Sequence, residues 1–481
     1  MVAIRVPAPE LPADMLFHSF GFFLFFWIVF AVYWSLPQLR SRNGWLVLAS
    51  CFFYGTWNPW LVSLILFTAA VDYVVARRLM TTEAPTMRRA LLALSVCVTL
   101  SLLVFFKYAN FLAASAVFGL NLAGAHLKSP LWDIVLPLGI SFYTFETISY
   151  VVDVYRRRIP AARSILDYAL YILFFPHLIA GPIVRPGFFL PQVQRMKRFD
   201  WARLQLGVQI FLRGLFKKAV LADHLVAIVD PVFAAPASYS TGTIWLAVPC
   251  YAVQVYCDFS GYSDMAVGTA HAFGFKLPVN FNLPYFSESV SEFWRRWHIT
   301  LSSWLRDYVY IPLGGSRGSR VRTYANLIFT LTICGLWHGA AWNYVVFGLY
   351  HGVILSLERA LPLPPALARW PFRPLRIAWT FLLLCAGLVI FRSPKITDAW
   401  LILQKAVRAV DGQTLPPELI RIAFVILALV FAGHLFGSLR KPHRWFARIP
   451  PVVMGIGMAL FFLLIQLLMP AESAPFVYFQ F

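Results

Sequence analysis

The chain has 481 residues, of which 60% are hydrophobic and 13% charged, and its formal net charge is +20. Soluble domains are about 45–50% apolar and about 25% charged, so this composition excludes an ordinary soluble enzyme. The basic residues lie in short loops between apolar runs, which is typical of cytoplasmic loops that face anionic lipid headgroups and argues against nucleic-acid binding. We therefore expect an all-α polytopic membrane protein.

Apolar runs of the length that a membrane helix needs recur from one end of the chain to the other. With shorter pieces they predict about eleven membrane helices. No repeat or long polar linker divides the sequence, so we expect one membrane domain over residues 1–481, in which 1–14 form a flexible N-terminal extension. The clear runs are Leu16 to Leu36, Trp60 to Val75, Ala90 to Phe106, Leu131 to Val152, Ile165 to Val184, Ile244 to Tyr256, Tyr324 to Leu357, Ile377 to Phe391, Ile420 to Phe436 and Val452 to Met469.

Between Pro186 and Lys218 the composition becomes basic and amphipathic. Such a stretch is typical of a segment that lies in the membrane interface. We expect its last helix to end at Lys217 and Lys218.

A second change of composition lies in residues 274–323, where Pro278, Pro284 and Pro312 interrupt a segment too polar to cross lipid as a simple helix. Backbone that is not helical at membrane depth must be covered by protein or line a wet cavity. We expect a broken or re-entrant segment in the catalytic region. A helix that only rests on the headgroups is the alternative.

Two histidines are candidates for chemistry. His338 lies deep in an apolar run, in CGLWHGAAWN, where an ionisable group is costly and indicates function by default. The small residues around it favour a lined cavity, although a histidine that only joins two helices by a hydrogen bond is the alternative. His298, in RRWH, lies 40 residues earlier and meets His338 if the broken segment folds back. A histidine suits general-base removal of a hydroxyl proton, and no G-x-S-x-G nucleophile motif is present.

Carboxylates also stand in an apolar run, in the block YCDFSGYSD. Asp258 and Asp264, with Gln254 and Ser260, predict a polar network that is structural or orients the substrate. The glycine between them permits close helix packing. A cation site is the alternative, but no histidine or cysteine stands at ligand spacing, so we expect no metal.

These blocks together resemble the membrane-bound O-acyltransferase (MBOAT) family, in its bacterial branch typified by the alginate O-acetyltransferase and the D-alanyl transferase of teichoic acids. The resemblance covers nearly the whole chain. It is carried, in order, by LFHSFGFFLFF, FFYGTWNPW, LPLGISFYTFETISYVVDVYRR, FFPHLIAGPIVRP, GLFKKAVLAD, YCDFSGYSDMAVG, NFNLPYFSESVSEFWRRWHITLSSWLRDYVYIPLGG and GLWHGAAWNYVVFGLYHG.

The resemblance implies the MBOAT fold, a ring of tilted helices around a central tunnel, with re-entrant and interfacial helices. The family's essential histidine falls on His338, and its second position, histidine or asparagine, falls on His298. Acyl-CoA is expected from the cytoplasm, with Arg295 or Arg296 near its phosphates, and the acceptor hydroxyl from outside. The remaining candidates for lining the tunnel are Asp258, Gln254, Ser260, Trp337 and Asn343.

The chain closes with PFVYFQF, residues 475–481, an aromatic tail that contains Tyr478. It resembles the tail of the small partner protein in teichoic-acid D-alanylation, where a tyrosine accepts the acyl group. We therefore hypothesise a relay in which His338 activates Tyr478. An aromatic anchor at the membrane boundary is the alternative.

The resulting expectation is a multi-pass enzyme of the bacterial cytoplasmic (inner) membrane. It would take acetyl from cytoplasmic acetyl-CoA, with no bound cofactor, and pass it to an extracytoplasmic polysaccharide, alginate-like or another exopolysaccharide, through an SGNH-type periplasmic O-acetyltransferase. Transfer of D-alanyl or another acyl group is one alternative. A transport component is another, although we find no inverted repeats. A catalytically silent scaffold has no use for two imidazoles in apolar surroundings.

Overall fold

The computed structural model describes residues 17–362, 364, 366, 369–438, 449–470 and 474–477. Within these residues the chain is helical and has no β-strand; a single isolated bridge joins Tyr239 and Gln413. This confirms the predicted all-α class. The expected N-terminal extension and Tyr478 lie outside the described residues.

Contacts divide the chain into two compact units, each assembled from separate parts of the sequence. Among the described residues, the N-terminal unit comprises 17–211 and 262–278, and the C-terminal unit comprises 212–261 and the described residues from 279 to 477. Two helices, α10 and α12, contribute residues to both units.

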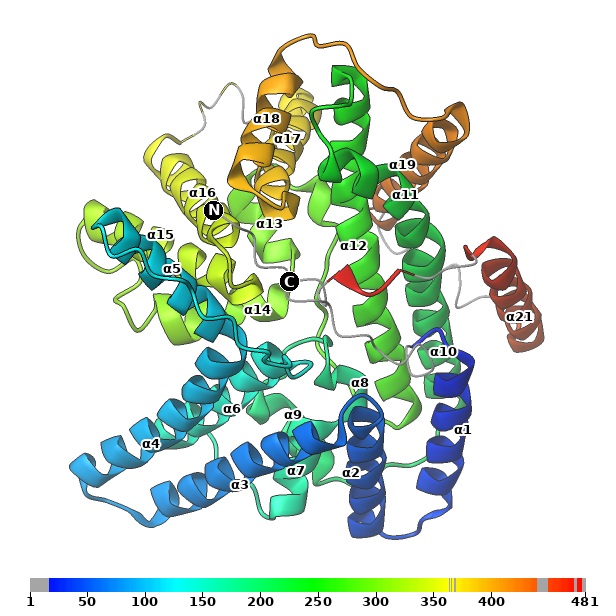
Figure 1. Ribbon diagram of the computed structural model, residues 1–481. Helices are drawn as coiled ribbons and strands as arrows, with labels where there is room; N and C mark the ends of the chain where they lie inside the picture. Colours follow the sequence, from blue (N-terminus) through cyan, green and yellow to red (C-terminus); the bar gives the residue numbers. More distant parts are fainter. Residues whose placement is uncertain are drawn as a thin grey trace. The chain divides into compact units, whose positions relative to one another are not determined.

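The N-terminal unit holds nine complete helices among its described residues, together with the start of α10 and the end of α12 (Figure 1). Helices α3, α4, α6 and α7 pack against one another, and α2 packs against α3 and α7. Their bounds are α1 Phe20–Ser35, α2 Leu39–Gly55, α3 Pro59–Thr81, α4 Pro85–Leu103, α5 Ala109–Leu122, α6 Ile140–Tyr155, α7 Ile165–Leu173, α8 Phe175–Leu178, α9 Pro186–Val193, α10 Trp201–Leu215 and α12 Thr241–Ala272.

The C-terminal unit carries the later helices and the broken segment. A π-helical turn, Phe216–Ala222, joins α10 to α11. The helices are α11 Asp223–Ala234, α13 Val290–Arg296, α14 Ile299–Leu305, α15 Arg320–His338, α16 Trp342–Ala360, α17 Arg373–Arg392, α18 Ile396–Val407, α19 Pro417–Ser438 and α21 Pro451–Leu468.

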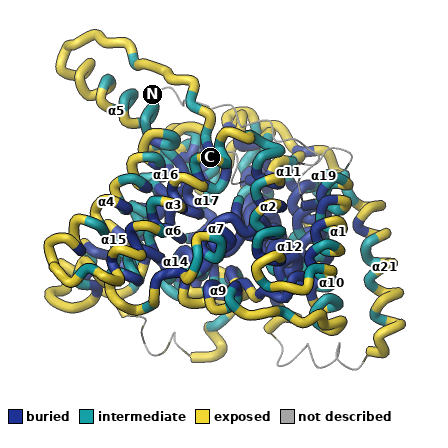
Figure 2. Tube along the Cα trace, turned by 90° about the horizontal axis from the view of Figure 1, so that it is seen from below, coloured by how far each residue is buried: buried dark blue, intermediate teal, exposed yellow. Residues whose placement is uncertain are grey.

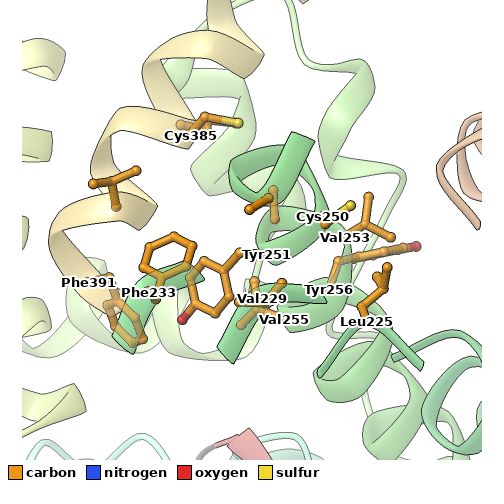
Figure 3. Packing of buried hydrophobic residues seen from close by; sticks show 14 of the residues in the cluster. Leu225, Val229, Phe233, Cys250, Tyr251, Val253, Val255, Tyr256, Cys385 and Phe391 are labelled. Atoms are coloured by element: carbon orange, nitrogen blue, oxygen red, sulfur yellow. The ribbon is translucent and has the colours of Figure 1, made fainter. Parts of the chain in front are cut away.

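A hydrophobic core in the C-terminal unit joins α11, α12 and α17 (Figure 3). Phe233 and Tyr251 pack with ring centroids 5.5 Å apart, and Phe391 lies beside them in the figure. Cys250 and Cys385 contribute free thiols to the same core. This core fixes the end of α17 near the candidate site described below.

Gly261 on α12 explains how closely α12 approaches the end of α10. A Cβ at this position would lie 2.7 Å from the carbonyl oxygen of Gly214 and 2.9 Å from the amide nitrogen of Lys218. Only glycine permits this approach, as the sequence indicated. The close contact brings Lys218 against α12.

Five helical segments within the described residues are long and apolar enough to cross a membrane: Pro59–Thr81, Pro85–Leu122, Trp370–Arg392, Pro417–Ser438 and Pro451–Leu468. The shorter helix Phe20–Ser35 is also apolar. In Figure 2, α21 is mostly exposed, with Ile465 as its one buried residue, whereas much of α12 is buried. The chain is therefore a multi-pass membrane protein. The count of about eleven membrane helices remains a prediction.

Two apolar runs are divided in the structure. The run Ile165 to Val184 splits into α7 and the one-turn α8, because Pro176 has no amide hydrogen to continue the first helix. The run Tyr324 to Leu357 becomes the antiparallel pair α15 and α16. Apolar composition alone does not reveal these breaks.

Candidate functional site

His298 stands at the break between α13 and α14. Ser289 caps α13 by accepting a hydrogen bond from the amide of Glu292 (3.1 Å), and α13 ends at Arg296. His298 then takes a left-handed backbone conformation, with φ +42°, immediately before α14 begins. Asn280 holds the new helix start, because its backbone oxygen accepts from the amide of Ile299 (3.0 Å). The segment predicted to be broken thus places an imidazole at its sharpest turn.

The imidazole of His298 lies in a dry aromatic pocket. The residue is 0% exposed, and its ring centroid lies 4.6 Å from that of Phe259 and 5.8 Å from that of Trp337. Burial lowers the pKa of His298, and the neighbouring His338 lowers it further. His298 is therefore neutral at pH 7.

His338 is the last residue of α15, and it is also buried. Its ring lies 5.0 Å from Trp337 and 5.3 Å from Phe391, centroid to centroid. Beside it, a Cβ on Gly339 would lie 2.1 Å from the ring of Tyr344, so side-chain packing fills the space that the small residues leave at this point. Trp337 thus contacts both histidines, and the structure brings together the two imidazoles that the sequence singled out.

A buried ionic network joins the π-helical turn Phe216–Ala222 to α11 and α12. The ammonium of Lys218 is 2.8 Å from Asp223 and 2.8 Å from Asp258. Lys218 is 3% exposed and Asp258 is 1% exposed. The expected helix end at Lys217 and Lys218 was wrong, because the chain stays helical through the π-helical turn Phe216–Ala222 into α11. The side chain of Lys218 is buried in the protein. The placement of this stretch in the membrane interface remains a prediction.

The described part of the C-terminal tail is attached to this network. Lys218 Nζ donates to the carbonyl oxygen of Ala474 (2.8 Å), and the amide of Val477 donates to Asp258 Oδ2 (2.9 Å). The ring of Phe476 lies 5.8 Å from that of Phe259, which also contacts His298. The tail therefore reaches the aromatic group around the histidines.

Comparison with known proteins decides the family. The pattern of the MBOAT, membrane-bound O-acyltransferase family, matches residues 154–386. The probable alginate O-acetylase AlgI of Azotobacter vinelandii is 42% identical, over 80% of this chain and 77% of its own length. The chain belongs to the MBOAT family. It is an O-acyltransferase, in the branch that holds the alginate O-acetylases.

Two more distant relatives are named for other acceptors. The peptidoglycan O-acetyltransferase of Helicobacter pylori is 38% identical, over 75% of this chain and 72% of its own length. The teichoic acid D-alanyltransferase of Streptococcus thermophilus is 30% identical, over 46% of this chain and 57% of its own length.

The other polar candidates in this O-acyltransferase have separate surroundings. Gln254 is buried, and its Oε1 accepts no hydrogen bond from the described residues. Ser260 accepts one from Lys217 Nζ (3.1 Å). Asn343 donates to the carbonyl oxygens of Phe391 (3.3 Å) and of the Ser393 backbone, so its amide ties α16 to the end of α17. The buried Oε1 of Gln254 therefore has an acceptor available for a ligand.

The arginines expected near the donor phosphates are at the end of α13. Arg295 is exposed and donates to Ser291 (2.9 Å). Arg296 forms an ion pair with Glu292 (2.7 Å). Asp264 belongs to the N-terminal unit, whereas Asp258 belongs to the C-terminal unit. No group of three or more metal-ligating side chains occurs in the described residues.

Sequence reasoning missed three participants in this site: Lys218, Phe259 and Phe476. The only local signal for Lys218 was a second lysine directly after Lys217. Phe259 stood next to a singled-out aspartate, but one phenylalanine among 44 carries no signal of its own. Their roles depend on contacts between distant parts of the chain.

Proposed function

We propose that this O-acyltransferase takes acetyl from cytoplasmic acetyl-CoA and passes it across the membrane for O-acetylation of an extracytoplasmic polysaccharide. The observation that carries the proposal is the pair of buried imidazoles, His298 and His338, whose rings both pack against Trp337. The names of two relatives, an alginate O-acetylase and a peptidoglycan O-acetyltransferase, add support, since alginate and peptidoglycan are both extracytoplasmic polysaccharides. Acetyl is preferred to D-alanyl because the D-alanyltransferase matches under half of this chain.

The chemistry that we propose begins at His338. Its imidazole takes the proton of the attacking hydroxyl, the oxygen bonds to the acetyl carbon, and the bond from that carbon to sulfur breaks. The coenzyme A thiolate then receives the proton from the imidazolium. A dry, preorganised pocket strengthens hydrogen bonds to the developing oxyanion, and a neutral His298 can donate one.

We further propose that the attacking hydroxyl belongs to Tyr478, which then carries acetyl as a phenolic ester to the outer acceptor. Support comes from the tail contacts, since Tyr478 directly follows Val477, whose amide donates to Asp258. In the second step the acceptor oxygen attacks the ester and the phenol leaves with a proton. The alternative for Tyr478 is an aromatic anchor at the membrane boundary.

Several further parts of the proposal concern the enzyme's setting. We place it in the bacterial inner membrane as a single domain of about eleven membrane helices around a tunnel, with an SGNH-type transferase as the partner that completes the reaction. Arg295, which is exposed, is a candidate contact for the donor phosphates, and Gln254 for the tunnel lining.

The test is transfer of label from acetyl-CoA to purified protein in nanodiscs, in the wild type, His338→Ala and Tyr478→Phe. Label that both substitutions abolish supports the relay. Label lost only in His338→Ala keeps the enzyme and discards the relay. A protein that neither binds acetyl-CoA nor accepts label points to another acyl donor or to transport.

His434→Ala is the matched control. His434 is a buried histidine on α19 that packs against Tyr256 and Tyr285 and not against Trp337 in the described contacts. Its variant reports what loss of a buried imidazole does to the fold. It is expected to keep the label.

A further inference from the structure

Two hydrogen bonds from the C-terminal tail complete the bonding of Lys218 and Asp258. A lysine ammonium has three donors, and that of Lys218 contacts Asp223, Asp258 and the carbonyl oxygen of Ala474. Asp258 uses Oδ1 for Lys218 and Oδ2 for the amide of Val477. Two of these contacts come from the tail, so removing it would leave a buried donor and a buried acceptor without those partners.

The same contacts place the tail beside the histidines. Phe259 follows Asp258 in the chain, and its ring contacts Phe476 on one side and His298 on the other. Both Phe476 and Val477 are buried. The ion pair between Lys218 and Asp258, together with the neighbouring ring of Phe259, thus holds the described tail residues in place.

We propose that Lys218 and Asp258 form a clamp that positions the C-terminal tail at the histidine site. They are positioning residues, since they act through the tail. The consequence for acyl transfer rests on the proposed function of Tyr478, but the clamp itself can be tested without activity.

The clamp is tested by the accessibility of a thiol introduced by Val477→Cys. The more accessible native thiols, Cys51 and Cys97, are first replaced by alanine. In this background we expect slow maleimide labelling at position 477, and labelling at least tenfold faster after Asp258→Asn or Lys218→Met. Peptide mapping by mass spectrometry reads every site separately.

Two internal controls separate release of the tail from unfolding. Cys250 and Cys334 are buried in the C-terminal unit and must stay unlabelled. Asp72→Asn removes a different buried aspartate, one that accepts hydrogen bonds from Ser95 and Tyr168, and must leave position 477 protected. Unchanged labelling in both clamp variants overturns the proposal.

A second pair of variants tests the clamp from the side of the tail, in case the network variants do not fold. Val477→Pro removes the amide donor and keeps Lys218 and Asp258, whereas Val477→Ala keeps the donor. Transfer of label that falls at least tenfold only in the proline variant supports the clamp, and equal transfer in the two contradicts it. If position 477 is released in the clamp variants while Tyr478→Phe stays fully active, the clamp stands and the relay fails.

A separate observation concerns a pocket in the N-terminal unit, which we call the basic pocket. Its volume is about 960 Å³, within the range of ligand sites. It is formed by α9, the segment that joins α9 to α10, the start of α10 and residues that follow α12. The cations that line it are Arg195, Lys197, Arg198, Arg203 and Lys276.

Charge in the basic pocket is almost entirely of one sign. Asp200 is its one acidic lining residue, and its carboxylate accepts from the amide of Ala202 (2.9 Å) at the start of α10. In the described part of the chain none of the five cations forms an ion pair with a carboxylate. Burial lowers the pKa of Lys197 to about 8, with Arg203 and Arg195 adding repulsion. The walls are held by Gln192, which exchanges hydrogen bonds with the backbone of Lys276 (3.1 and 2.8 Å).

We infer that the basic pocket binds a ligand with more than one phosphate charge, supplied either by a free nucleotide or by a phospholipid headgroup. Arginine and lysine are the usual partners of phosphate oxygens, and one-signed charge in a concave site concentrates such anions.

The probes are adenosine diphosphate in calorimetry and cardiolipin, a phospholipid with two phosphate groups, retained in native mass spectrometry. The variant combines Arg198→Gln with Lys276→Gln, and Arg408→Gln, an exposed cation of the C-terminal unit, is the control. Nucleotide binding that the double variant weakens at least tenfold assigns the pocket to a free nucleotide. Retained lipid that only the double variant loses assigns it to a headgroup. The inference is overturned if the protein shows neither response, or if the control variant loses binding equally.

Discussion

Lys218 in the C-terminal unit and Lys197 in the N-terminal unit have opposite electrostatic surroundings. Lys218 is buried between two carboxylates, and a carbonyl oxygen of the tail accepts its third hydrogen bond. Lys197 shares the basic pocket with four other cations and lies over the ring of Phe275, 4.9 Å from its centroid. The buried ion pairs of Lys218 hold the tail in place. Among the residues that the structure describes, the cations around the basic pocket have no carboxylate partner and are available for an anionic ligand.

The largest effect is expected from Lys218→Met, which leaves two buried carboxylates without their cation. Breaking a buried pair in this way costs about 3–5 kcal/mol of unfolding free energy. Lys217→Met is the comparison variant: its ammonium donates to Ser260 (3.1 Å) and lies 5.8 Å from the ring centroid of Tyr256, and its loss is expected to cost less than the loss of Lys218. Thermal unfolding of both variants in the same detergent provides the measurement. Equal shifts of Tm would mean that the pairing around Lys218 contributes nothing special.

A smaller effect concerns pH in the basic pocket. The ammonium of Lys197 has a pKa lowered to about 8 by burial and by Arg203 and Arg195, so its charge is present below pH 8 and is lost above it. The other charged groups that line the pocket are Arg198, Lys276 and Asp200. Affinity for adenosine diphosphate should therefore fall, by up to about tenfold or 1.4 kcal/mol, as pH rises from 7 to 9.

Lys197→Arg provides the comparison, because an arginine keeps its charge throughout this range. Calorimetry of the two proteins at both pH values should show the fall only in the wild type. The same fall in both would assign the titration to another group.

The smallest expected effect is on stability. Lys197→Met removes one of five like charges, so it relieves repulsion and stabilises the fold by about 0.5 kcal/mol or less. This is opposite in sign to Lys218→Met. Urea unfolding followed by tryptophan fluorescence measures it, and a loss above 1 kcal/mol would show that Lys197 has a structural partner.

The sequence predicted the histidine pair and missed the clamp, for a physical reason. An imidazole in an apolar run stands out against its neighbours, and the prolines of the segment 274–323 indicated the fold-back that brings His298 to Trp337. Lys218 follows an amphipathic helix, where a lysine normally lies at the membrane interface. Its partners are Asp258, 40 residues later, and the carbonyl oxygen of Ala474, 256 residues later, so local pattern does not reveal them.

The backbone at His298 limits which residues can occupy that position. Its φ of +42° lies in the left-handed region, which β-branched side chains avoid and which histidine, asparagine and aspartate tolerate better than most. An exchange of histidine for asparagine therefore leaves the turn between α13 and α14 in place, whereas valine or isoleucine would distort it. The residues that position 298 can accept are thus limited by chain geometry before any chemistry is considered.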